Sequence, residues 1–185
     1  GLGTEDVPDD SSVPPGGEAG EGAEPTDEAA ADLVGVELLS VPLPLLRRTS
    51  EQYDALLREF RLIAEHEPNS RAVPGRLVAL SDELSGRYSS FTVSTDAALA
   101  AALERGDASI DLHYRLPVDV GAAAAHYDEM LDEADAWCRA GELLTLAPPL
   151  DAVALRKWLL LEFVHQVAGS PAVAWPDSVW AASLR

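Results

Sequence analysis

The sequence contains one Glu-x-x-His pair, Glu162 and His165, whose residue types suit transition-metal binding. Residues three apart share a helix face, and a carboxylate with an imidazole is a ligand pair that such metals accept. His126 and Glu129 form the reverse pair earlier in the chain. Di-iron helical bundles need two Glu-x-x-His motifs and two additional glutamates. Because only one forward motif occurs, we expect these side chains to be partly exposed helix residues, with a metalloenzyme or small-molecule-binding site as the alternative.

A second candidate region is a run of carboxylates at Asp128, Glu129, Asp132, Glu133 and Asp135. A calcium loop needs alternating oxygen ligands and a turn glycine, whereas this run is typical of a helix. Like charges four residues apart repel each other, and solvent weakens the repulsion. We therefore expect a solvated helix face, and a docking surface for an Arg-rich partner is the alternative.

The single cysteine, Cys138, lies on an apolar stripe beside Trp137. A reactive thiolate needs a histidine or a cation close by to lower the thiol pKa. Arg139 follows directly in sequence, so it points to a different face of the helix. We expect a buried core cysteine, and one cysteine excludes an internal disulfide framework and a multi-cysteine metal cluster.

Two further sites offer weaker signals. His113 lies on the polar face of an alternating segment, where it could act as a base or a pH sensor, but no catalytic motif accompanies it. We expect a surface histidine. Arg156 and Lys157, next to Trp158, form a compact cationic pair that could bind an anion. Two charges are a weak signal, so we expect a surface pair that flanks a core tryptophan.

Several motif classes are absent from the sequence. It has no Gly-x-x-x-x-Gly-Lys, no Gly-x-Gly-x-x-Gly and no Gly-x-Ser-x-Gly. Nucleotide hydrolysis, dinucleotide chemistry and ordinary hydrolase chemistry therefore lose support together. We expect no catalytic residue, no metal and no cofactor. Whether the protein is an enzyme is left open, and the sequence favours a protein without enzymatic activity.

The charge of the chain restricts its partners. Among 185 residues there are 32 acidic and 13 basic side chains, a formal net charge of −19, and residues 1–46 contain 11 acidic residues and neither Lys nor Arg. Nucleic acids and anionic membranes both attract Lys and Arg, so neither is an expected partner. The sequence shows no apolar run of the ~20 residues that a spanning helix needs, and no signal-peptide pattern. We expect a cytoplasmic protein.

Hydrophobic patterning predicts an α+β, predominantly helical fold with about five helices packed against a two-stranded β element. A β-branched run at 34–41 and period-two alternation at 110–117 predict the two strands, which we expect to pair. Apolar residues at helical spacing predict helices over 50–66, 74–88, 95–105, 120–140 and 150–168. Residues 142–149 are expected to form a short connector.

Local signals set the expected boundaries. Thr49 with Gln52 has the spacing of a capping box, Asp119 is expected to cap the fourth helix, and Gly106 and Gly141 suit left-handed C-caps. We expect residues 1–31 to form a disordered acidic arm, 32–176 a single globular helical domain and 177–185 a C-terminal tail. The apolar faces of the helices are expected to enclose a shared interior without a polar-lined cavity.

Five strings in the sequence together resemble a group of uncharacterised small helical actinobacterial proteins. They are LLREFRLIA at 56–64, VPGRLVALSDEL at 73–84, IDLHYRLP at 110–117, LDEADAWCRAGELLTLAPP at 131–149 and RKWLLLEFVHQVAG at 156–169. Genes of this group lie near those for anti-sigma-factor-type ATPases, PP2C-like phosphatases and STAS-domain regulators. The resemblance covers residues 34–176 and implies a regulatory setting, with no catalytic residue to carry over.

These observations favour a non-enzymatic regulatory protein that binds a protein partner. The resemblance points to a sigma-factor partner-switching or stress-signalling circuit, with an anti-sigma kinase, a phosphatase or a STAS-type regulator as the partner. A homodimer that pairs through an exposed surface at Trp158 or Leu161 is a further possibility.

Overall fold

The structure, a computed structural model, describes residues 32–66 and 73–184. The acidic arm expected at 1–31 lies outside the described residues. Within them are a two-stranded sheet, five α-helices and one short 3-10 helix, so the α+β, predominantly helical fold class is confirmed. No helix in these residues is long and apolar enough to cross a membrane.

The two strands pair as expected. β1 (Leu33–Pro42) runs antiparallel to β2 (Ser109–Pro117), with a bulge between Leu38 and Val41. Ser40 lies in the bulge with a φ of 58°, and its backbone N–H donates to Asp111 at 2.6 Å. One face of the sheet is apolar and buried because side chains alternate along each strand. That face contains Val36, Leu38, Val41, Leu112 and Leu116.

The first helix begins earlier than the sequence predicts. α1 (Leu43–His66) follows β1 directly, and Pro44 lies in its first turn, where the missing N–H of proline costs no hydrogen bond. The capping-box prediction for Thr49 was therefore wrong. Thr49 lies inside the helix and its side chain is buried.

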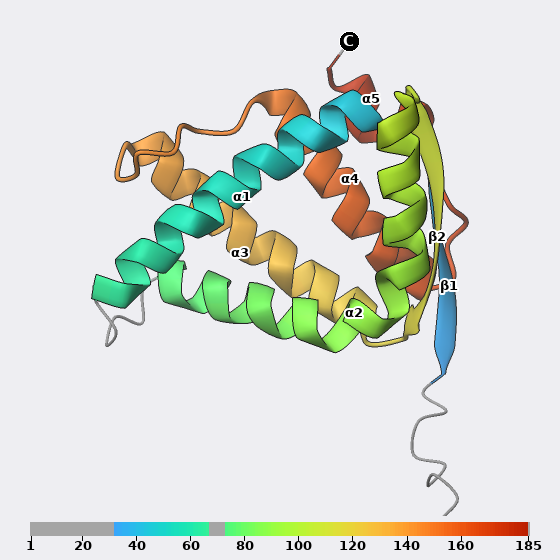
Figure 1. The fold of residues 1–185 in the computed structure, drawn as a ribbon, viewed down its shortest axis with the longest axis horizontal. Coiled ribbons are helices and arrows are strands. Elements are labelled where there is room, and N and C mark those ends of the chain that lie inside the picture. The colour runs from blue at the N-terminus through green and yellow to red at the C-terminus, as the bar shows by residue number, and fades with distance from the viewer. Residues whose placement is uncertain (1–31, 67–72, 185) are drawn as a thin grey trace, which may run out of the picture. The chain divides into compact units, whose positions relative to one another are not determined.

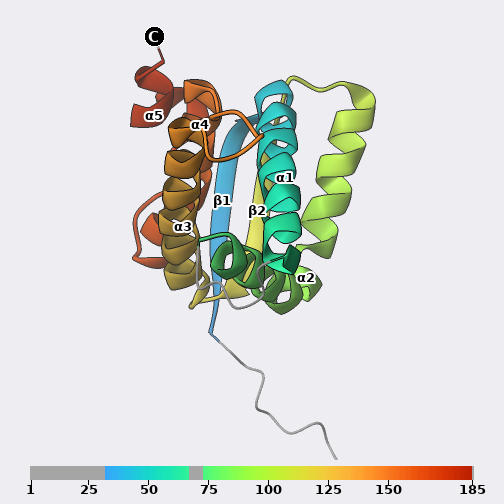
Figure 2. The ribbon, with the colours of Figure 1, turned by 90° about the vertical axis from the view of Figure 1, so that its left-hand side faces the viewer.

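The helices predicted at 74–88 and 95–105 form one continuous helix, α2 (Val73–Arg105). Figure 1 shows that α2 bends near its middle into two arms, one passing below α1 and one rising beside the strands. Figures 1 and 2 together show α4 and this second arm on the same side of the two-stranded sheet, with α4 beside β1 and the arm beside β2. Thr95 in the second arm ties it to β2 by donating a hydrogen bond to the carbonyl of His113 at 2.8 Å.

The bend in α2 has a local cause. Ser89 Oγ donates to the carbonyl of Gly86 at 3.1 Å, whereas Thr92 Oγ1 donates to Asp96 Oδ2 at 2.7 Å. Hydroxyls that bond back to the preceding turn bend helices, and Gly and Ser favour kinks. The two predicted helices therefore correspond to the two arms.

The remaining helices complete the fold. α3 (Val120–Ala140) and α4 (Leu150–Val167) pack against each other, and Gly141 ends α3 with a φ of 75°. Gly106 likewise follows α2 with a φ of 74°, so both glycine C-caps are confirmed. Asp119 precedes α3, but its side chain makes no capping bond and instead binds Arg87 and Tyr88 of α2.

Residues near the C-terminus pack against the rest of the fold instead of forming a loose tail. The 3-10 helix η1 (Trp175–Asp177) leads into α5 (Val179–Ala182), and the ring of Trp175 lies 5.5 Å from that of Trp158. Ala181 is buried in the same cluster. Trp158 is almost fully buried, which confirms its place in the core and excludes the exposed tryptophan surface proposed for a dimer.

Candidate functional site

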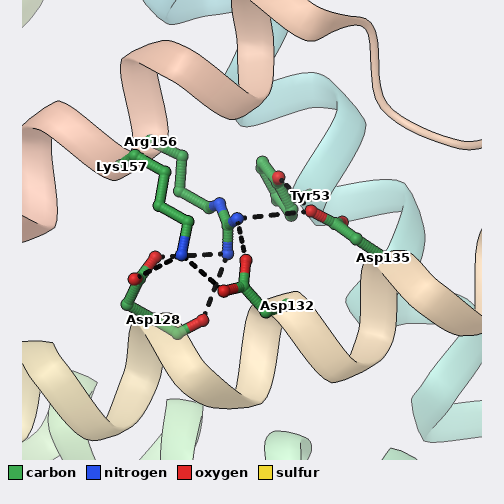
Figure 3. Close-up of polar contacts among 6 residues, drawn as sticks. All are labelled: Tyr53, Asp128, Asp132, Asp135, Arg156 and Lys157. Carbon is green, nitrogen blue, oxygen red and sulfur yellow. Dashed lines mark hydrogen bonds and ion pairs between the residues drawn. The ribbon is translucent and has the colours of Figure 1, made fainter. Parts of the chain in front are cut away.

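Five charged side chains from two helices meet where α3 packs against α4, next to a tyrosine from a third helix, and one of the five, Asp132, is half exposed. Asp128, Asp132 and Asp135 lie on one face of α3 because they are spaced four and three residues apart. Arg156 and Lys157 of α4 face them, and Figure 3 shows both cations pointing towards the aspartates. Tyr53 of α1 closes the cluster, which we call the buried charge cluster.

The contacts within this cluster are short. Arg156 Nη2 lies 2.6 Å from Asp132 Oδ1 and 3.3 Å from Asp135 Oδ2, and Arg156 Nη1 lies 3.4 Å from Asp128 Oδ1. Lys157 Nζ donates to Asp128 Oδ2 at 2.7 Å and also to Asp132. Only 4% of the Arg156 side chain and 2% of the Asp135 side chain are exposed. Such charges are tolerated inside a protein only when they are paired.

The cluster corrects three sequence-based expectations. The solvated helix face was wrong for Asp128 and Asp135, although Glu129, Asp132 and Glu133 are exposed. The surface cationic pair was wrong for Arg156, which is buried. The expectation of a shared interior without a polar-lined cavity did not foresee that ionised side chains lie inside the protein. The alternative was that this acidic helix docks an Arg-rich partner. The arginine that faces it, Arg156, belongs to the same chain.

The pKa values of Asp132 and Asp135 shift in opposite directions. Burial raises the pKa of Asp135 above its usual value, and Arg156 offsets part of this effect. For Asp132, burial acts in the same direction, but hydrogen bonds from Lys157 and Arg156 outweigh it and lower the pKa. Three carboxylates face two cations, so Asp135 is the member whose charge is least compensated.

Tyr53 and Arg156 are also in direct contact. The guanidinium carbon of Arg156 lies 5.5 Å from the centre of the Tyr53 ring, within cation–π distance. The Tyr53 hydroxyl donates to Asp135 Oδ2 at 3.2 Å. Burial raises the pKa of Tyr53 well above its usual value, so the phenol stays protonated and remains a donor.

A cavity of about 230 Å³ adjoins the cluster between α1, α3 and α4. Its wall is mostly apolar and includes Tyr53 and Arg156. The other lining residues are Leu46, Thr49, Ser50, Asp54, Leu57, Tyr127, Leu131, Leu159 and Leu160. We call this cavity the α1–α4 pocket.

The Glu-x-x-His residues do not come together with the reverse pair. Glu162 is buried, which was not expected, and it accepts hydrogen bonds from Gln166 Nε2 at 2.7 Å and the Val173 N–H at 3.2 Å. His165 is exposed, although it lines the same cavity of about 220 Å³ as Glu162. Over residues 32–66 and 73–184, no three His, Cys, Asp or Glu side chains are placed to share a metal ion.

The reverse pair is a surface feature. His126 and Glu129 are both exposed, and His126 Nδ1 lies 4.0 Å from Glu129 Oε2. Glu162 instead belongs to a structural network, because its partner Gln166 bonds to both the N–H and the carbonyl of Glu37 on the edge of β1. These two bonds occupy strand-edge groups that would otherwise be free to pair with another strand.

Cys138 and His113 lie where the sequence predicts. Cys138 is buried, and burial raises the pKa of its thiol. A raised pKa favours the unreactive protonated form, in agreement with a core cysteine. His113 is exposed on the sheet, and its Nδ1 lies 3.3 Å from Glu37 Oε1.

The connector between α3 and α4 carries a feature that the sequence analysis missed. Both carboxylate oxygens of Glu59 accept backbone hydrogen bonds, from Leu144 at 2.6 Å and from Thr145 at 2.7 Å. Gln52 Nε2 donates to the carbonyl of Leu146 at 2.7 Å. Burial of Glu59 acts against its charge, but the two backbone N–H groups lower its pKa below the usual value.

Leu143 of this connector packs against the core, whereas three other leucines in and beside it point into solvent. Leu144 is 93% exposed, Leu146 80% and Leu150, at the start of α4, 81%. We call residues 141–150 the pinned loop, because side chains of α1 hold its backbone while Leu144, Leu146 and Leu150 stay exposed. The sequence signal for this loop is visible only in hindsight. Three leucines, Leu144, Leu146 and Leu150, lie within seven residues that include the two prolines at the end of the connector.

The chain thus presents a pinned apolar loop on its surface and a buried charge cluster beside a pocket. The two features lie on different sides of α1, because Gln52 and Glu59 face the loop whereas Thr49 and Tyr53 face the pocket. In comparisons with known proteins, the chain matches no family model, no curated protein and no solved structure.

Proposed function

We propose that the protein is a non-enzymatic, cytoplasmic regulatory protein that binds a protein partner through the pinned loop. The observation that carries this proposal is the exposure of Leu144, Leu146 and Leu150 on a backbone held by Glu59 and Gln52. Apolar side chains gathered on a surface mark interaction sites more often than isolated ones do. A loop that is already ordered loses little entropy on binding, so its contacts translate into affinity.

Charge narrows the chemistry of the partner. The chain has a net charge of −19, and Glu142 within the loop is exposed. A complementary partner has an apolar groove with a basic rim, because opposite charges speed encounter and fix the orientation. The sequence resemblance supports a partner from a sigma-factor partner-switching circuit: an anti-sigma-type ATPase, a PP2C-like phosphatase or a STAS-domain protein.

Calorimetric titration of the full chain against purified proteins of these three classes from the source organism tests the proposal. We expect one of them to bind, and the double variant L144S/L146S to weaken binding by about tenfold or more, as loss of central apolar contacts does. V93S is the matched control, because Val93 is an exposed apolar residue of α2, outside the loop. Binding by none of the three, or equal binding by both variants, contradicts the proposal.

A second copy of the chain is the competing occupant of the loop. Light scattering of the purified protein over a range of concentrations distinguishes the two cases. A monomer at all concentrations agrees with a separate protein partner. A dimer that L144S/L146S dissociates would assign the loop to self-association and overturn the proposal.

A further inference from the structure

We propose that the cavity beside Glu162 binds a small organic ammonium ion with an apolar body, and that the Glu162 carboxylate is the counter-charge of this ion. The cavity has a volume of about 220 Å³ and lies between α4 and the segment that forms η1 and α5. We call it the α4–α5 pocket. It shares no lining residue with the α1–α4 pocket or the pinned loop, so the inference does not depend on the protein partner.

The fold uses only one of the two carboxylate oxygens of Glu162. Oε2 accepts both hydrogen bonds, from Gln166 Nε2 at 2.7 Å and from the Val173 N–H at 3.2 Å. Oε1 accepts none from the described residues, and unlike the unpaired atoms of the buried charge cluster it is not sealed off by surrounding atoms. The residue is only 4% exposed and lines the α4–α5 pocket, so Oε1 is the oxygen that a ligand there can reach.

No cation of the described residues balances this carboxylate. The buried aspartates of α3 differ in this respect, because Arg156 pairs with both Asp128 and Asp135. Neither Lys nor Arg lines the α4–α5 pocket over the residues that the structure describes, and Asp177 adds a second carboxylate to its wall. Removing a carboxylate from water is costly unless a counter-charge replaces the lost solvation. The pocket therefore favours a cation over a neutral molecule or an anion.

The fitting cation is organic and not a metal ion. Glu162, His165 and Asp177 line the same pocket, but in the described part of the chain no three such side chains are placed to share a metal. A metal ion needs several ligands at short distances. An ammonium group needs only acceptors for its N–H groups, and a hydrogen bond between two charged partners is about twice as strong as a neutral one.

The size and the wall of the pocket define the rest of the ligand. Its volume of about 220 Å³ exceeds the ~150 Å³ of an apolar cavity that accepts benzene. An aromatic ring with a short alkylammonium arm therefore fits. The wall is mainly apolar and would pack against such a ring; its apolar members are Trp158, Leu161, Val173, Val179 and Trp180.

Titration of the full chain with three matched probes, followed by two-dimensional ¹H–¹⁵N NMR, tests the inference. The probes are phenethylamine, 2-phenylethanol, which is neutral, and phenylacetate, which is an anion. The titration is run at about pH 8, where imidazole is neutral and an alkylammonium group is charged. We expect saturable shifts for phenethylamine at residues that line the pocket, with an affinity about tenfold above that of 2-phenylethanol. Phenylacetate should bind most weakly.

The variant E162Q removes the charge and can keep the fold. The amide oxygen takes the place of Oε2 and accepts the same two hydrogen bonds, which turns the NH₂ group towards the pocket. We expect E162Q to abolish the preference for phenethylamine over 2-phenylethanol. E129Q is the matched control, because Glu129 is an exposed carboxylate of α3 that does not line this pocket, and it should retain the preference.

A second variant, D177N, keeps the test decisive if E162Q does not fold. Asp177 is exposed, so its substitution does not disturb the core, and loss of its charge should lower the affinity for phenethylamine about twofold. The inference is overturned if phenethylamine gives no saturable shifts at the pocket, or if either of the other probes binds as tightly. It is also overturned if a folded E162Q retains the preference, or if E162Q does not fold and D177N leaves the affinity unchanged.

Discussion

Arg156 and Asp135 lie 3.3 Å apart with side chains that are almost completely buried, although 20 residues separate them in sequence. This pair joins α4 to α3 at the point where Tyr53 brings α1 into contact with both. The same arginine lines the α1–α4 pocket. One residue therefore takes part in the packing of three helices and in the wall of the pocket beside them.

Removal of the central cation should be strongly destabilising. R156M keeps most of the apolar length of Arg156 but leaves Asp135 buried without its counter-charge and Asp128 with Lys157 alone. We expect the free energy of unfolding to fall by about 3–5 kcal/mol. Urea denaturation measures it, and the double variant R156M/D135N should recover part of the loss because one uncompensated charge is removed. A decrease in the free energy of unfolding that is smaller than about 1 kcal/mol would contradict the role given to Arg156.

The raised pKa of Asp135 makes stability depend on pH in a defined direction. A carboxyl whose pKa is higher in the folded than in the unfolded chain contributes stability at low pH, which is lost as pH rises from 3.8 through the folded pKa. D135N mimics the protonated form and lacks this dependence. We therefore expect the stability of D135N relative to the unmodified chain to increase with pH across that range. Urea denaturation at successive pH values tests this, and a constant difference would contradict it.

Glu59 should control the order of the pinned loop. E59Q replaces one of the two acceptor oxygens with an NH₂ group, so the N–H groups of Leu144 and Thr145 can no longer both be satisfied. We expect amide hydrogen exchange at these two residues to accelerate about tenfold, as local opening becomes easier. E51Q is the control, because Glu51 is an exposed residue of the same helix. Equal exchange in both variants would show that Glu59 does not hold the loop.

The pKa of Glu59 also predicts how far the pH can be lowered before the pinned loop loses its order. The pKa of Glu59 is lowered from 4.5, so its contribution to order is present above that value and is lost as pH falls through the lower, folded pKa. Exchange at Leu144, corrected for the intrinsic pH dependence of amide exchange, should therefore be unchanged between neutral pH and pH 5. Loss of protection already at pH 5 would contradict a lowered pKa.

Two glycines should respond oppositely to alanine. A Cβ at Gly86 meets no atom within 4 Å, so G86A should stabilise α2 by about 0.5–1 kcal/mol through reduced chain entropy. A Cβ at Gly121 would lie 3.1 Å from Cβ of Val167, so G121A should destabilise the α3–α4 contact by about 1–3 kcal/mol. Thermal unfolding of both variants measures the effects, and a G121A protein as stable as G86A would contradict the close approach.

Elements governed by local patterns were predictable from the sequence. Strand pairing followed from the alternation around Leu112, and Gly141 ended α3 as its conformational freedom predicts. Local signals failed where two of them competed. Thr49 has the sequence of a cap, but Pro44 is equally compatible with a first turn and the helix begins there.

The candidate sites depended on contacts that no local pattern encodes. Nothing near Asp128 in sequence shows that Lys157 and Arg156 will cover it, because they lie 29 and 28 residues away on another helix. The same holds for Glu59, whose partners in the pinned loop are 85 and 86 residues distant. An acidic run therefore reads as a solvated face until the opposing helix is known.

Photo-crosslinking in cells of the source organism tests partner binding by the pinned loop most directly. Benzoylphenylalanine is placed at position 144 in one variant and at position 93 in another, since Leu144 and Val93 are both exposed apolar residues. We predict that position 144 forms a crosslink to one discrete protein, that position 93 does not, and that E59Q reduces the crosslink at 144. No crosslink at 144, or the same products from both positions, would contradict a partner-binding loop.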